Sequence, residues 1–297
     1  MSILKVKELI KSYGRIQALK GVSFAVPEGA VFGILGPNGS GKTTLLSIIL
    51  DVLNADSGSY EWFGKPAAPD LRKHIGSLLE TPNFYHYLSA VNNLKITSSI
   101  SGRGDINAID AVLQKVKLYE RRNSRFNTYS LGMKQRLAIA AALLGAPKIL
   151  VLDEPTNGLD PVGIMETREL IIELSKNGHT IIMASHLLDE VEKVCTHVAI
   201  LKTGTLVASG PVHDVLVDED IVEISAANME LLQQMVQDFP GAHQTVSSEQ
   251  YIQLYFEKGT AQLDAVNRFC YDKGIVLTQL LLKRKRLEEK FFELTNH

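Results

Sequence analysis

A glycine-rich segment near the N-terminus has the residue types that a phosphate-binding loop requires. Residues 36–44 read Gly-Pro-Asn-Gly-Ser-Gly-Lys-Thr-Thr and match the pattern G-x-x-x-x-G-K-[ST]. Glycines allow successive backbone N–H groups to point at phosphate oxygens, and a helix that begins here adds the partial positive charge of its N-terminus. We expect Lys42 to reach the β- and γ-phosphates of ATP and the Thr43 hydroxyl to bind Mg²⁺.

The alternative for this segment is a glycine-rich turn between a strand and a helix that binds nothing. A predicted strand at residues 31–35 precedes the loop and a predicted helix follows it, and this context favours the nucleotide site. The candidate nucleotide-binding residues of the loop are Gly36, Pro37, Asn38, Gly39, Ser40, Gly41, Lys42, Thr43 and Thr44.

Two adjacent carboxylates follow a second apolar segment. Residues 149–152 read Ile-Leu-Val-Leu, and Asp153 and Glu154 come directly after them. An apolar strand that ends in a carboxylate is how a P-loop ATPase places its Mg²⁺-associated Asp. Glu154 is suited to polarise the water that attacks the γ-phosphate. An acidic turn is the better interpretation for this segment by itself, and the P-loop upstream favours the catalytic one.

The elements that position these residues alternate between strand-like and helix-like patterns up to about residue 217. Short continuous apolar runs are typical of strands covered on both faces, as in a parallel sheet. Such runs occur at residues 31–35, 149–152 and 180–184. Helical patterns between them occur at residues 42–53, 134–144 and 161–176. Together they predict an α/β architecture, to which the alternating segments 4–9 and 22–26 add antiparallel strands.

The pattern changes after an acidic cluster at residues 218–220. We therefore predict a first domain over residues 1–217 and a small α+β domain over residues 218–297. Its strand-like and helix-like segments suit the order β-α-β-β-α-β of a ferredoxin-like domain, although the sequence shows only three clear strands.

Residues 130–136, Ser-Leu-Gly-Met-Lys-Gln-Arg, resemble the signature motif of ABC (ATP-binding cassette) proteins. Its common form is Leu-Ser-Gly-Gly-Gln; Ser130 and Gly132 match it, whereas Tyr129, Leu131 and Met133 depart from it. Ser130 is suited to cap a helix whose N-terminus directs free N–H groups at a phosphate. Taken alone, the segment could equally be a capped helix without a ligand. In the family, however, the signature of one cassette closes over the ATP on the P-loop of another, so the resemblance implies that Ser130 and Gly132 bind the partner's ATP.

Three other positions match family motifs in the expected order. Residues 155–160 resemble the D-loop, with Asp160 as its carboxylate, and His186 follows an apolar strand as the switch histidine near the γ-phosphate does. Tyr13 resembles the aromatic residue that stacks on adenine. A lone histidine is more often structural, and Tyr13 has a core or hairpin alternative, but their places among the other motifs favour the nucleotide roles.

One departure from the family pattern narrows the group. Residues 75–82 read Ile-Gly-Ser-Leu-Leu-Glu-Thr-Pro, so Glu80 stands where most ABC cassettes have a Gln, in the loop that touches Mg²⁺ and the membrane subunit. A Glu here, followed by Thr-Pro-x-x-Tyr, is similar to cassettes of the bacitracin and lantibiotic self-protection type. The resemblance implies Glu80 as a Mg²⁺ ligand and export of an antimicrobial peptide. A solvated loop acid is the alternative.

The resemblance covers residues 1 to about 215. It implies a P-loop NTPase fold of the ABC-cassette type with a helical signature subdomain at about residues 80–145. It also implies an ATPase that works as a cassette dimer, most simply a homodimer, with ATP and Mg²⁺ as cofactors and a membrane-spanning permease as partner. A soluble ABC ATPase acting on the ribosome or DNA is the alternative from another class, and an inactive regulatory module is a second one.

Bulk composition bears on these alternatives. The 297 residues carry a formal net charge of −2, so the chain lacks the basic footprint typical of nucleic-acid binding. No segment approaches the roughly 18 apolar residues of a membrane-spanning helix, so we expect the permease to be a separate chain. The two cysteines fit a reducing cytosol, and we expect the protein at the inner face of the cell membrane.

Overall fold

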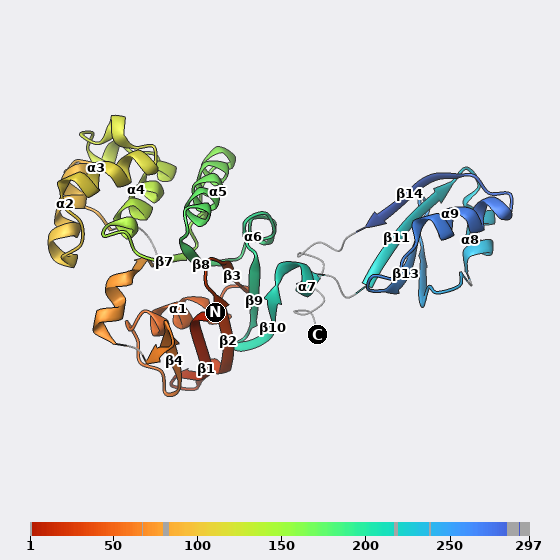
Figure 1. The fold of residues 1–297 in the computed structure, drawn as a ribbon, viewed down its shortest axis with the longest axis horizontal. Helices are drawn as coiled ribbons and strands as arrows, with labels where there is room; N and C mark the ends of the chain where they lie inside the picture. The colour runs from red at the N-terminus through yellow and green to blue at the C-terminus, as the bar shows by residue number, and fades with distance from the viewer. Residues whose placement is uncertain are drawn as a thin grey trace. The chain divides into compact units, whose positions relative to one another are not determined.

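The chain forms two compact units, Met1–Pro211 and Val212–His297 (Figure 1). The computed structural model describes residues 2–66, 68–79, 83–216, 219–237, 239–283 and 291. None of the helices in these ranges combines the length and the apolar character that crossing a membrane requires.

A six-stranded sheet forms the centre of the first unit. Its strands, in spatial order, are β10 (Thr205–Pro211), β9 (His197–Lys202), β3 (Val31–Leu35), β8 (Thr180–Ser185), β7 (Ile149–Asp153) and β6 (Ile75–Leu78). All neighbours run parallel except β10, which pairs antiparallel with β9. The three predicted buried strands are β3, β7 and β8, and every residue of each is buried. The predicted α/β fold with a parallel sheet is therefore confirmed, and the segments that follow these three strands meet at one edge of the sheet.

A second, antiparallel sheet covers the helix that follows the P-loop. Its strands, in spatial order, are β2 (Ile16–Pro27), β1 (Ser2–Tyr13), β4 (Ser57–Trp62) and β5 (Lys65–Pro66). Helix α1 (Lys42–Ile49) buries its leucines and isoleucines in a core shared by both sheets. The prediction extended this helix to residue 53, but it ends earlier because Asp51 adopts a left-handed conformation with φ of 61°.

Three helices, α2 (Ala90–Ser101), α3 (Ile106–Lys115) and α4 (Leu131–Leu143), lie together in the first unit (Figure 1). Each is preceded by a capping residue whose side chain accepts a hydrogen bond from the backbone N–H three residues further along the chain: Ser89, Asp105 and Ser130. The predicted helix at 134–144 begins three residues earlier because Ser130 caps it. Helices α5 (Pro161–Lys176) and α6 (Leu188–Val194) follow β7 and β8, and α5 has the predicted bounds.

The second unit has the predicted ferredoxin-like order. After helix α7 (Val212–Leu216) its elements are β11 (Glu219–Ala226), α8 (Met229–Val236), β12 (Gln244–Ser247), β13 (Ile252–Glu257), α9 (Leu263–Asp272) and β14 (Leu277–Lys283). The strands pair antiparallel in the order β12-β13-β11-β14. Strand β12 is the one that the sequence did not reveal. It lies at the edge of the sheet with no buried residue, so it has no alternating apolar pattern.

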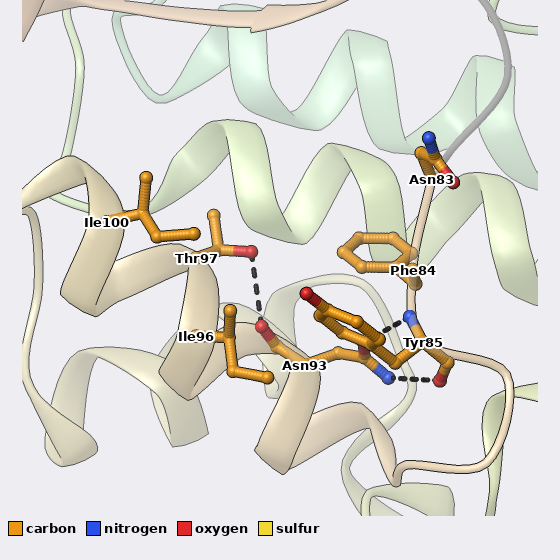
Figure 2. A pocket seen from close by; sticks show the side chains of 7 residues that line it. All are labelled: Asn83, Phe84, Tyr85, Asn93, Ile96, Thr97 and Ile100. Atoms are coloured by element: carbon orange, nitrogen blue, oxygen red, sulfur yellow. Dashed lines mark hydrogen bonds between the residues drawn. The ribbon is translucent and has the colours of Figure 1, made fainter.

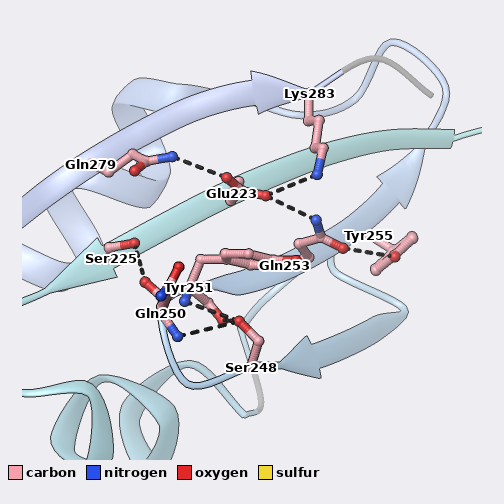
Figure 3. A network of polar contacts seen from close by, with 9 residues as sticks. All are labelled: Glu223, Ser225, Ser248, Gln250, Tyr251, Gln253, Tyr255, Gln279 and Lys283. Atoms are coloured by element: carbon pink, nitrogen blue, oxygen red, sulfur yellow. Dashed lines mark hydrogen bonds and ion pairs between the residues drawn. The ribbon is translucent and has the colours of Figure 1, made fainter. Parts of the chain in front are cut away.

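A buried carboxylate joins three strands of this sheet (Figure 3). Glu223 on β11 accepts hydrogen bonds from Gln253 (2.9 Å), Gln279 (3.0 Å) and Lys283 (3.2 Å). Burial by itself would raise the pKa of Glu223, but these hydrogen bonds and the charge of Lys283 hold the pKa below its usual value. The ionised carboxylate therefore ties β13 and β14 to the central strand.

A chain truncated at Val217 is expected to remain soluble and to bind ATP. The reason is that the two units have separate hydrophobic cores, one built around α1 and the other around β11 and β13. Nucleotide titration and sizing chromatography of the truncated chain would test this. Aggregation with loss of nucleotide binding would contradict it and make residues 218–297 an integral part of the first core.

Candidate functional site

The backbone conformation of the P-loop depends on its glycines. Gly39 and Gly41 have φ of 80° and 103°, in the left-handed region that favours glycine. A Cβ at Gly41 would lie 2.5 Å from the Ala18 carbonyl oxygen and 2.9 Å from a methyl of Leu19. The loop thus packs directly on the backbone of β2, and α1 begins immediately after Gly41.

The Lys42 ammonium is folded back over its own loop. Its Nζ donates hydrogen bonds to the backbone oxygens of Gly36 (2.7 Å) and Pro37 (3.3 Å) and lies 3.7 Å from Glu154 Oε1. The side chain is almost fully buried. A charge held this way is available for phosphate oxygens, because an ammonium has three donors that can be redirected.

The Thr43 hydroxyl donates a hydrogen bond of 3.0 Å to Asp153 Oδ2. Asp153 is the last residue of β7, next to β8 in the parallel sheet. Sheet order therefore brings a hydroxyl and a carboxylate together from positions 110 residues apart. Both are hard oxygen donors of the kind that Mg²⁺ prefers.

The Glu154 carboxylate is held by the residue that follows β8. The His186 Nδ1 and Glu154 Oε2 atoms are 2.8 Å apart. The Glu154 backbone has φ of 47°, uncommon outside glycine, and its N–H donates to the Ala184 carbonyl at 3.0 Å. The resulting turn directs the carboxylate toward the P-loop and away from the strand.

These groups surround one cavity of about 360 Å³. Its lining residues are Tyr13, Ala18, Asn38, Gly39, Ser40, Gly41, Lys42, Thr43, Thr44 and Glu154. Asp153 and His186 reach it through their contacts with Thr43 and Glu154. Tyr13, at the end of β1, is 47% exposed, so its ring is accessible for stacking.

A second cavity, of about 340 Å³, holds the signature residues. It is lined by Ser130, Leu131, Gly132, Gly158, Asp160, Val162, Gly163 and Glu166. Ser130 caps α4 by accepting from the Met133 N–H (3.2 Å), and Asp160 caps α5 by accepting from the Gly163 N–H (2.9 Å). Two helix N-termini therefore open into this cavity, and each contributes partial positive charge.

Comparison with known proteins agrees with this geometry. A family model described as ABC transporter matches residues 19–157. The bacitracin transport ATP-binding protein BcrA of Bacillus licheniformis is 36% identical, over 99% of this chain and 97% of its own length. The chain belongs to the ABC transporter ATP-binding family. It is the ATP-binding and ATP-hydrolysing subunit of such a transporter.

Other matches support the same assignment of this ABC subunit. The lantibiotic transport ATP-binding protein SrtF of Streptococcus pyogenes is 41% identical over 69% of this chain and 89% of its own length. A solved nucleotide-free ATP-binding cassette from an ABC transporter covers 71% of this chain and 92% of its own, with 27% identity and a TM-score of 0.65. A dimeric cassette bound to ADP and Pi covers 70% and 98%, with 27% identity and a TM-score of 0.63.

The ABC motifs predicted from sequence thus separate into two groups. Tyr13, Glu154 and residues 38–44 of the P-loop line the first cavity, and Ser130, Gly132 and Asp160 line the second. Asp153 and His186 are joined to the first cavity through Thr43 and Glu154. Gly36 and Pro37 do not line it, but their carbonyl oxygens accept hydrogen bonds from Lys42. Glu80 lies outside the residues that the structure describes. Sequence reasoning missed Ala18 and Glu166, because a lining alanine and a helical glutamate carry no motif and only the fold shows where they lie.

Proposed function

We propose that this ABC subunit works as a cassette dimer in which each ATP is held by the P-loop of one copy and the signature of the other. The observation that supports this is the division of the predicted ATP-contacting residues between two cavities. One copy presents Lys42, Thr43 and Glu154 at the first cavity and Ser130 and Gly132 at the second. A second copy, facing the first, would complete both sites.

Within the first cavity the proposed reaction is ATP + H₂O → ADP + phosphate. Lys42 would exchange its bonds to loop carbonyls for β- and γ-phosphate oxygens. Glu154 would accept a hydrogen bond from the attacking water and orient it. His186, 2.8 Å from Glu154, would keep that carboxylate in place near the γ-phosphate. Tyr13 would stack on the adenine ring.

The oxygen donors of this cavity fit Mg²⁺. The Thr43 hydroxyl and the Asp153 carboxylate lie together, and Mg²⁺ in phosphoryl-transfer sites takes few protein ligands. Among the described residues no group of three or more His, Cys, Asp or Glu side chains could hold a metal by itself, so phosphate and water oxygens would complete the shell. Held by Thr43 and Asp153, a Mg²⁺ ion would supply positive charge that offsets the negative charge of the phosphates. We keep Glu80 as a proposed third contact.

At the second cavity the proposed roles concern the partner's ATP. The Ser130 hydroxyl and the N-terminus of α4 would face its γ-phosphate, where free N–H groups favour an anion. Gly132 would allow the phosphate close to the backbone. Asp160, already bonded to the Gly163 N–H, would shape the loop between the two cassettes.

A third cavity, of about 340 Å³, is the proposed docking place of the permease at the inner face of the cell membrane. It lies between the loop at residues 83–89 and helix α2, and its lining residues are Asn83, Phe84, Tyr85, Asn93, Ile96, Thr97 and Ile100 (Figure 2). Tyr85 is 50% and Ile100 82% exposed, so aromatic and aliphatic surface is available to a partner helix.

Asn93 holds this docking loop in shape. Its Oδ1 accepts from the Tyr85 N–H (2.8 Å), and its Nδ2 donates to the Tyr85 carbonyl (3.1 Å) (Figure 2). The same Nδ2 also donates to the Ser89 carbonyl (3.1 Å). The amide is almost fully buried, and so its hydrogen bonds are costly to lose.

Asn93→Ala is expected to remove most of the stimulation of ATPase activity by the permease while basal activity changes less than about twofold. The docking loop would lose the hydrogen bonds that Asn93 makes to its backbone, whereas Asn93 does not line the P-loop cavity. The measurement is ATPase rate with and without the permease, and Asn92→Ala, at the exposed neighbouring position, is the matched control. Glu80→Ala is the second variant; it should lose little ATP affinity in the isolated subunit but should also lose the stimulation by the permease. Equal stimulation of wild type and both variants would show that this loop does not couple the subunits.

Export of an antimicrobial peptide is the proposed transport activity. Its support is likeness to subunits of bacitracin and lantibiotic transporters, one of them over 99% of this chain. Co-expression with its permease should raise the resistance of a sensitive bacterium to such a peptide, and Glu154→Gln should abolish the effect. Unchanged resistance would refute the substrate class. Recovery of ribosomes in place of a membrane protein in a pull-down would refute the transport role.

A further inference from the structure

Arg136 and Glu166 form an ion pair that connects the two helices meeting at the second cavity. The Arg136 Nη2 and Glu166 Oε2 atoms are 3.4 Å apart, and the two side chains are 12% and 35% exposed. Arg136 lies on α4 and Glu166 on α5, each six positions after the residue that caps its helix. The pair therefore bridges the helices at roughly 9 Å from both N-termini.

At the N-termini themselves the helices meet through glycine. A Cβ at Gly132 would lie 3.8 Å from the Gly163 Cα, and one at Gly158 would lie 3.4 Å from a Leu131 methyl. Glycine-to-glycine contact allows close approach, but it offers no interdigitating side chain that would define the angle between the helices. A directional contact further along the helices, such as an ion pair, can supply that constraint.

Arg136 depends on this partner. Its Nε is buried and has no hydrogen-bond partner among the residues that the structure describes. A shielded guanidinium that lost its carboxylate would have to regain solvent, since leaving such a charge unpaired is strongly unfavourable. Loss of Glu166 should therefore displace α4 relative to α5.

We propose that Arg136 and Glu166 are a positioning pair that holds Ser130, Gly132 and Asp160 in one surface for the ATP bound to the other cassette. This rests on the proposed function, in which the second cavity serves the partner's ATP. Glu166 lines that cavity, so a change in the pair alters its wall directly.

The test uses the full chain carrying Glu154→Gln, which is expected to retain ATP and accumulate as a dimer. Four variants are made in this parent: Arg136→Gln, Glu166→Gln, both of these together, and the exchanged pair Arg136→Glu with Glu166→Arg. The readouts are the ATP concentration for half-maximal dimer, by light scattering, and the affinity of the monomer for ADP. Glu169→Gln is the matched control, because Glu169 also lies on α5 and pairs with Lys117, with 3.8 Å between Lys117 Nζ and Glu169 Oε2. This pair is 65% and 57% exposed, so its loss should matter little.

Each single change is expected to raise the half-maximal ATP concentration about tenfold, and the double change no further, because the two residues act as one unit. The exchanged pair should recover part of the loss. The affinity for ADP should equal that of the parent in every variant, and Glu169→Gln should also keep the parent's half-maximal ATP concentration. Unaltered dimer formation in both single variants, or losses that add in the double variant, would overturn the proposal. If a variant loses both its affinity for ADP and its ability to form the dimer, the pair stabilises the fold as a whole, and the proposal is overturned. A parent that never dimerises would refute the proposed function and this inference with it.

Discussion

Glu154→Gln is expected to lower the rate of ATP hydrolysis by about 10²- to 10⁴-fold, the usual contribution of a general base. Glutamine keeps the size of the side chain and can still contact His186, which lies 2.8 Å from the carboxylate. It lacks the negative charge that polarises the attacking water. ATP should therefore bind and persist, and the stalled protein should run as an ATP-bound dimer on a sizing column.

Phosphate release and sizing chromatography in ATP measure the two halves of this expectation. Glu120→Gln, an exposed carboxylate on a short helix of the first unit, is the control and should behave as wild type. Hydrolysis at the wild-type rate by the Glu154 variant would show that another group activates the water. If the variant hydrolyses ATP slowly but stays monomeric in ATP, Glu154 remains the general base and the proposed cassette dimer is contradicted.

Lys42→Ala is expected to weaken ATP binding by about 10- to 100-fold, which corresponds to losing hydrogen bonds between an ammonium and charged phosphate oxygens. The ammonium already lies within the P-loop, 2.7 Å from the Gly36 carbonyl oxygen, so little rearrangement separates it from a bound phosphate. Turnover and ATP-dependent dimer formation should therefore fall together with ATP binding, whereas the Glu154 variant should lose turnover but keep ATP binding and the dimer.

Titration with ATP, followed by calorimetry, would measure this loss. Lys42→Met preserves most of the aliphatic stem and separates the effect of charge from that of packing, which matters because the side chain is nearly buried. Lys20→Ala, at an exposed position on β2, is the surface control. ATP affinity equal to wild type in both Lys42 variants would remove Lys42 from the phosphate site.

The sequence by itself determined the elements whose conformation depends on nearby residues. The P-loop needs left-handed backbone at Gly39 and Gly41, and only glycine adopts it without strain, so the motif predicts its own geometry. The segments at residues 31–35 and 149–152 are continuous apolar runs, since both faces of a parallel sheet are covered. The residues proposed for catalysis follow such strands directly and were therefore identifiable.

Only the tertiary structure decided which of these residues meet. Thr43 contacts Asp153, and Glu154 contacts His186, because β3, β8 and β7 are neighbours in the sheet, and no spacing along the chain prescribes that order. The same holds for Arg136 and Glu166, whose partnership follows from how α4 packs on α5. Strand β12 could also be identified only in the structure. It is an edge strand without buried side chains that forms through backbone pairing with β13, so it leaves no apolar pattern in the sequence.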